Sequence, residues 1–149
     1  MAIPLNEVAA MKLINWHGQR QDLLSLLWIY LTVNYIYCDV FTLHLADYLE
    51  AFLAGDVGGM KITEEFLLIF AVIMQIPMIM IVLSRVLIFP VNKVVNLLAG
   101  VITTSVQALS LTGGGTPHYM LFSFFEISTG LVIIYLASSW RPTKLDQSK

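Results

Sequence analysis

The chain has 149 residues, of which 58% are hydrophobic and only 12% are charged, and its net charge is −2. Soluble domains carry about a quarter charged residues, so this composition excludes an ordinary soluble fold and favours a single membrane domain. The positive charges are too thinly spread for a nucleic-acid surface, and one cysteine, Cys38, excludes a dithiol redox enzyme within one chain.

Four apolar segments follow one another, and each can cross a hydrocarbon core about 30 Å thick, which needs roughly 20 helical residues. They are residues 23–45, 64–89, 91–111 and 117–140. Thr63 and Thr116 are expected helix caps, and Pro90 leaves only a very short turn between the second and third segments. We therefore predict an all-α fold: a four-helix transmembrane bundle in one domain, residues 1–149.

Orientation follows from the basic residues. Seven of the eight lysines and arginines fall on the side of the two termini, and Lys61 alone falls on the other side. Basic residues are enriched in cytoplasmic segments, so both termini are expected in the cytoplasm of a multi-pass protein of the inner (plasma) membrane. Residues 1–22 are then a cytoplasmic segment, either an interfacial helix or a frayed terminus, and residues 141–149 a cytoplasmic tail. An acidic loop, 46–63, faces outward.

An acid lies inside the first apolar segment, in the stretch VNYIYCDVFTLH that contains Asp39. Polar and small residues recur at intervals of three and four in all four segments, as in the seam of a helical bundle, so we expect them to face one another. From the helical rise, Asp39 lies about 9 Å and Glu126 about 13 Å below the outer ends of their helices. Gln107 and Gln75 lie about 6 Å and 16 Å down. The sequence thus predicts two acids and two amides turned away from lipid in the outer half.

No lysine or arginine lies at the depth of these acids. Two carboxyl groups close together in a poorly solvated site are costly to ionise together, so one should keep its proton unless a cation enters. We therefore expect a site that binds a proton or a small cationic ligand. Its residues are predicted to be Asp39, Glu126, Tyr35, Gln107, Gln75 and His118.

Other polar residues have simpler interpretations. Arg85, Asn92 and Asn96 surround the expected cytoplasmic turn and should anchor it. The histidines lack the spacing of a metal site, and enzyme motifs are absent, so we predict no catalytic residue, metal or cofactor.

The seam allows several functions. The acids could instead form a structural pair, protonated and bonded to Tyr35, Gln107 or Ser123, and the two glutamines could join helices. The chain would then be an accessory or assembly subunit of a membrane complex without its own ligand. A membrane enzyme acting on a lipid-soluble substrate is a third class. The expected partners are the lipid bilayer, an unidentified small ligand and a second copy in a homodimer, because four helices are few for a transport pathway.

Four stretches together resemble an uncharacterised family of small bacterial four-helix membrane proteins, a domain of unknown function. They are NYIYCDV, QIPMIMIVLSRVL, NKVVNLLAG and TPHYMLFSFFEI, and the resemblance covers roughly residues 28–140. It implies a fold but no activity. Members often have an acid before the Ile-Pro of the second helix, where this chain has Gln75, so no charged role at that position is implied. The marked polar positions that it implies are Asn34, Asp39, Arg85, Asn92, Asn96, His118, Tyr119 and Glu126.

Overall fold

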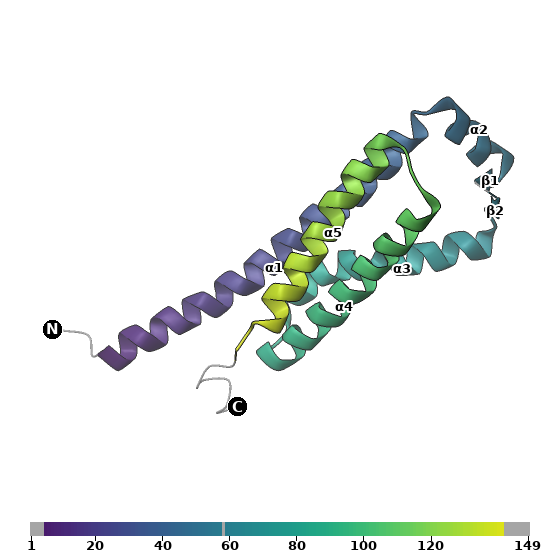
Figure 1. Ribbon diagram of the computed structural model, residues 1–149. Coiled ribbons are helices and arrows are strands. Elements are labelled where there is room, and N and C mark those ends of the chain that lie inside the picture. The colour runs from purple at the N-terminus through teal and green to yellow at the C-terminus, as the bar shows by residue number, and fades with distance from the viewer. Residues whose placement is uncertain (1–4, 58, 142–149) are drawn as a thin grey trace.

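A computed structural model describes residues 5–57 and 59–141, with side chains from residue 19 onward. The elements in chain order are α1 (Leu5–Leu43), α2 (Ala46–Ala54), β1 (Asp56–Val57), β2 (Met60–Lys61), α3 (Glu64–Val86), α4 (Phe89–Ser110), the 3-10 turn η1 (Leu111–Gly113) and α5 (Pro117–Ser138). The long helices α1, α3, α4 and α5 form a bundle in which the chain reverses direction from one to the next (Figure 1). The predicted all-α four-helix bundle is confirmed.

Four helical stretches in the described part of the chain are long and apolar enough to cross a membrane. They are Gln19–Leu43, Glu64–Val86, Phe89–Gly113 and Pro117–Ser138. The first of these is part of a longer helix, because α1 begins at Leu5 and runs 39 residues without a break. The polar residues that precede the first apolar segment are therefore helical from Leu5 onward and continuous with it.

The turn between α3 and α4 is tighter than a proline break alone requires. α3 ends at Val86 and α4 already begins at Phe89, so Pro90 lies in the first turn of α4. Amides in the first turn have no partner within the helix, and a proline there loses no hydrogen bond. The Asn92 side chain donates to the carbonyl of Ser84 at 2.7 Å, which ties the start of α4 to the end of α3.

The end of the bundle that contains this turn, called the terminal end, is the more tightly packed. Asn96 Oδ1 accepts hydrogen bonds from the Trp28 indole at 2.8 Å and the Ser84 hydroxyl at 3.0 Å. The Asn96 amide donates to Asn92 Oδ1. These bonds join α1, α3 and α4 through side chains that are fully buried. Apolar residues surround them: Leu24, Leu31, Met80, Ala99, Ile133 and Trp140.

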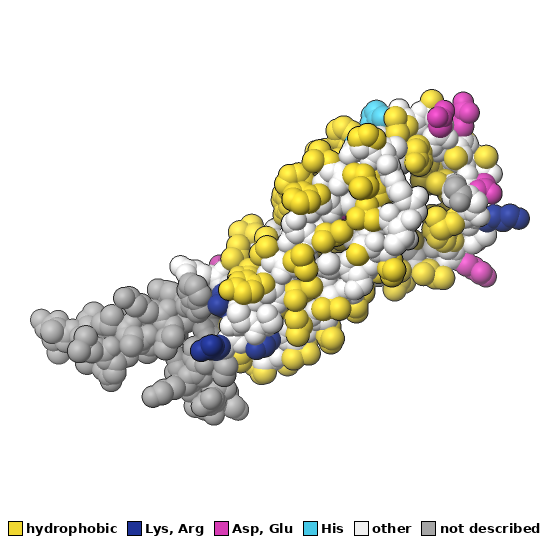
Figure 2. All heavy atoms as spheres, in the orientation of Figure 1, with side chains coloured by type: hydrophobic (Ala, Val, Ile, Leu, Met, Phe, Trp, Pro, Cys, Tyr) yellow, Lys and Arg dark blue, Asp and Glu magenta, His cyan; other side chains and the backbone are white. Residues whose placement is uncertain are grey.

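At the opposite end, called the loop end, the helices separate. The pair α1 and α5 diverges there from α3 and α4, and α2 with the β1–β2 hairpin connects α1 to α3 (Figure 1). Hydrophobic side chains cover the length of the bundle in Figure 2, with acidic side chains mostly at the loop end and basic ones mostly toward the terminal end. An apolar belt between polar ends is the surface expected of a bundle in a bilayer.

The close contact of α4 with α5 depends on a small residue. Gly130 of α5 faces Thr104 of α4, and a Cβ atom at Gly130 would lie 3.3 Å from the Thr104 Cβ and closer still to its hydroxyl. Gly130 therefore serves packing between two helices of the same chain, as expected of small residues on the seam.

We predict that Gly130→Val lowers the free energy of unfolding by about 1–3 kcal/mol, because an enlarged side chain forces α4 and α5 apart. Thermal unfolding in detergent, followed by circular dichroism, measures the effect. Gly113→Ala is the control, since a Cβ there would meet no atom within 4 Å. Equal melting temperatures for the two variants would contradict this interpretation of the α4–α5 contact.

Candidate functional site

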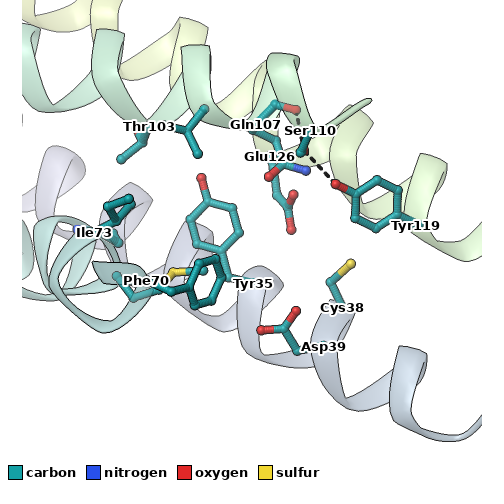
Figure 3. A pocket seen from close by; sticks show the side chains of 13 residues that line it. Tyr35, Cys38, Asp39, Phe70, Ile73, Thr103, Gln107, Ser110, Tyr119 and Glu126 are labelled. Carbon is teal, nitrogen blue, oxygen red and sulfur yellow. Dashed lines mark hydrogen bonds between the residues drawn. The ribbon is translucent and has the colours of Figure 1, made fainter. Parts of the chain in front are cut away.

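The divergence of the helices leaves a cavity of about 140 Å³ in the half of the bundle nearer the loop end. All four long helices contribute to its wall, and we call it the acid cavity. Its polar lining residues are Tyr35, Asp39, Thr103, Gln107, Ser110, Tyr119 and Glu126; the others are Cys38, Phe70, Ile73, Met74, Pro77 and Val106. Figure 3 shows most of these side chains pointing toward a common space.

Glu126 is the unusual member of this lining. Its side chain is 2% exposed, and neither carboxyl oxygen has a hydrogen-bond partner in the described part of the chain. α5 directs it inward, and Figure 3 shows its carboxyl group pointing into the cavity. Most buried polar atoms in proteins are hydrogen-bonded, so a carboxyl group with both oxygens unpartnered calls for a specific explanation.

The structural-pair alternative requires Glu126 to bond with Tyr35, Gln107 or Ser123, and those bonds do not form. The Gln107 amide instead donates to the Ser123 hydroxyl at 2.8 Å, joining α4 to α5 beside the carboxyl group. The carboxyl oxygens of Glu126 are thus without a hydrogen-bond partner among the described residues.

Asp39 lines the acid cavity, as its place on the helical seam predicted, but it is not enclosed by it. Asp39 is exposed, while its neighbour Cys38 is 4% exposed. Consecutive helical residues point about 100° apart, so two neighbours can differ in exposure. The Asp39 side of α1 faces the region where α1 and α3 are separated by the two hollows. The carboxyl group still borders the acid cavity, on the side opposite Glu126 (Figure 3). The two acids therefore share one cavity, with Glu126 inside it and Asp39 at its edge.

Tyr35 and Gln107 also line the acid cavity, as the seam predicted, whereas His118 does not. The His118 ring lies within 3.3 Å of the Thr42 hydroxyl through Nε2 and within 2.9 Å of the Thr116 hydroxyl through Nδ1. It therefore joins the loop-end parts of α1 and α5 and does not line the acid cavity.

Gln75 is the second predicted site residue that lies elsewhere. It is exposed and lines an apolar groove between α3 and α4. The cavity face of α3 carries Phe70, Met74 and Pro77 instead. The groove residues Val72, Gln75 and Ile79 recur at intervals of three and four, and so do the three cavity residues. Spacing alone could therefore not decide which stripe of α3 faces inward.

Other cavity residues were not among the predicted site residues, although some had a signal. Tyr119 and Ser110 belong to the polar stripes of their helices, and the Tyr119 hydroxyl donates to the Ser110 hydroxyl at 2.6 Å. Phe70 and Cys38 had none, because an apolar side chain in an apolar helix carries no mark of facing a cavity.

The remaining polar residues lie away from the cavity. Asn34 donates to the Tyr30 carbonyl of its own helix at 2.9 Å. Arg85 lies 3.5 Å from Asp22 in an ion pair whose side chains are more than half exposed, and such pairs contribute little stability. Asn92 and Asn96 belong to the terminal-end network.

The acid cavity combines carboxyl groups with aromatic rings. The described residues contain no group of three or more His, Cys, Asp or Glu side chains that could hold a metal. Around the two carboxyl groups lie the rings of Tyr35, Phe70 and Tyr119 (Figure 3). Aromatic rings attract ammonium and guanidinium groups through their faces, while a carboxylate supplies the opposite charge.

Comparison with known proteins identifies the family. A family model described as a family of unknown function (DUF6326) matches residues 11–147. The chain belongs to this family. The resemblance to an uncharacterised family is therefore confirmed, and the DUF6326 match itself assigns no activity. No curated protein and no solved structure matches the chain.

For this DUF6326 protein we predict that Glu126→Met raises the free energy of unfolding. A buried polar group without a hydrogen bond costs about 1–3 kcal/mol, and an apolar side chain of similar size removes that cost. Chemical unfolding in detergent measures the change. Glu50→Met on exposed α2 is the control and should leave stability nearly unchanged. A destabilised Glu126→Met variant would mean that the carboxyl group supports the fold.

Proposed function

We propose that this protein is a multi-pass membrane protein that binds a small organic cation at Glu126 in exchange for a proton. The observation that carries the proposal is the buried Glu126 carboxyl group, which has no partner and points into the acid cavity. Ionisable residues inside spanning segments are expensive and are commonly retained for ligands or protons.

The exchange follows from electrostatics. No lysine, arginine or histidine lines the acid cavity, so nothing in its wall neutralises a charged carboxylate. A bare charge in such a site is costly, and a proton on Glu126 removes that cost when the cavity is empty. An arriving cation supplies both the charge and the contacts that replace this proton. Binding should therefore release a proton.

Asp39 supports a route by which the cation enters. Its exposed carboxyl group stands at the edge of the cavity, where a negative charge raises the local concentration of cations. Glu126, deeper in the bundle, then receives the cation in a drier environment. The two acids have different tasks in this proposal, attraction at the entrance and binding inside.

The proposed location is the cytoplasmic membrane, with both termini in the cytoplasm and the loop end outside. The apolar length of the bundle and the basic residues near the terminal end support this orientation. The acid cavity would then lie in the outer half of the bilayer and load from outside.

We predict that the purified protein binds ethyltrimethylammonium and that Glu126→Gln weakens the affinity at least tenfold, since the amide keeps the size but not the charge. Equilibrium dialysis of the radiolabelled cation in detergent measures binding. A pH electrode in weakly buffered solution should record acidification on binding. Glu50→Gln, an exposed acid on α2, should bind as the wild type does.

The circular dichroism spectrum of each variant shows whether the fold is intact. Wild-type affinity in a folded Glu126→Gln protein would overturn the proposed site. Binding to the wild type without acidification would overturn the exchange of cation for proton.

An assembly role has its own observation in Gln75. This amide lies in the apolar α3–α4 groove within a spanning helix, and it makes no hydrogen bond with the described residues. We propose that two copies pair across this groove. A twofold axis would bring the two Gln75 side chains together, so that each amide satisfies the other, as amides do between helices in lipid.

We predict that Gln75→Leu weakens dimerisation about threefold to tenfold, the worth of one hydrogen bond between helices in lipid. Light scattering of the protein in detergent over a range of concentrations measures the dimer fraction. Asn34→Leu is the control, because its amide already bonds within α1. A wild-type protein that stays monomeric, or equal dimer fractions in the wild type and Gln75→Leu, would exclude this interface.

A further inference from the structure

A second hollow, of about 410 Å³, lies beside the acid cavity at the loop end. It is bounded by the last turns of α1, the first turns of α3, and α2 with the hairpin. We call it the apolar chamber, since most of its lining is hydrophobic: Leu43, Phe52, Val57, Met60, Ile62, Phe66 and Leu67, with Asp39, Thr42 and Phe70. The amide of Ile62 donates to the Gly55 carbonyl at 2.9 Å, which closes the base of the hairpin.

The chamber and the acid cavity adjoin each other. Asp39 and Phe70 line both, so no further layer of residues separates the two spaces at that point. A molecule bound near Glu126 could therefore extend past Asp39 and Phe70 into the apolar chamber. The boundary between the two spaces consists of one carboxyl group and one aromatic ring. These would contact the part of a ligand where a positive group is joined to an apolar group.

The two hollows differ in volume, so they can hold different parts of one ligand. Sites for whole drug-sized molecules measure about 300–1,000 Å³, so the acid cavity is too small for one and the apolar chamber is large enough. The acid cavity can hold a compact charged head. The chamber offers hydrophobic walls to a part several carbons long.

The charges select the sign of that head. Neither lining contains a lysine, arginine or histidine, and the residue at the junction is an aspartate. A fatty acid or an anionic lipid placed here would bring its negative group beside Asp39 and Glu126. A cation meets two carboxyl groups and the face of Phe70, which attracts ammonium groups.

We propose that the ligand is an amphipathic organic cation, with its positive head at Glu126 in the acid cavity and its apolar part in the chamber beneath α2 and the hairpin. This inference rests on the proposed cation site and adds the second half of the ligand. The apolar chamber then determines affinity and chain-length selectivity, while Glu126 determines charge selectivity.

A homologous series of cations tests it. Alkyltrimethylammonium ions with alkyl chains from ethyl to octyl are titrated into the protein in detergent. The amount of each ion bound is measured as a function of its free aqueous concentration. Affinity should rise about fourfold for each added methylene that enters the chamber. The same series with protein-free micelles of the detergent measures uptake by the micelle, which is subtracted.

Variants separate the chamber from the head-group site. Ile62→Trp fills the chamber and should flatten the dependence on chain length, while ethyltrimethylammonium binds as to the wild type. Leu53→Trp is the control, because Leu53 lies on α2 at the same end, is 82% exposed and does not line the chamber. Val57→Trp, on the hairpin, replaces Ile62→Trp if that variant does not fold.

The outcomes distinguish the two proposals. A flat series with intact binding of ethyltrimethylammonium, or an unchanged slope in Ile62→Trp, overturns the inference and leaves the cation site standing. Failure of the wild type to bind ethyltrimethylammonium overturns the proposed function and this inference with it. Octanoate that binds as tightly as octyltrimethylammonium would make the chamber a lipid site and contradict the proposal.

Discussion

One buried carboxyl group distinguishes the loop-end half of this bundle from the other half. Glu126 points into a cavity where neither of its oxygens finds a hydrogen-bond donor in the described chain. Such a group opposes folding unless a proton or a ligand compensates for it. The wall around it is acidic and aromatic, and its lining residues include no basic side chain, which is the basis of the proposed cation site.

Contacts elsewhere in the bundle compensate for the unfavourable burial of Glu126. At the terminal end, Trp28, Ser84 and Asn92 converge on Asn96 in a network whose side chains are all buried and bonded. This network and the apolar residues around it join α1, α3 and α4. Because one half of the bundle is held this firmly, the other half can diverge and keep two adjoining hollows.

Within the loop-end half, the contacts of α5 decide where Glu126 points. Gly130 lets α5 approach Thr104 of α4, and the Gln107–Ser123 hydrogen bond joins the same two helices nearer the loop end. Glu126 lies between these two contacts along α5, so its backbone is held at both sides. The cavity opens toward α3 and toward Asp39.

The sequence by itself determined the class of fold, the four long apolar helices, the tight turn at Pro90 and the positions of Asp39 and Glu126 along their helices, because hydropathy and helical rise depend only on order along the chain. It also placed Tyr35 and Gln107 correctly beside the acids. Only the tertiary structure decided that Gln75 faces a different groove, that His118 joins helix ends and that Asp39 stands at the edge of the cavity. The physical reason is that periodicity identifies a stripe on a helix, whereas packing against neighbours fixes the rotation of that helix and the gap beside it. The apolar chamber left no trace in the sequence, since its walls are ordinary hydrophobic residues brought together by the divergence of the helices.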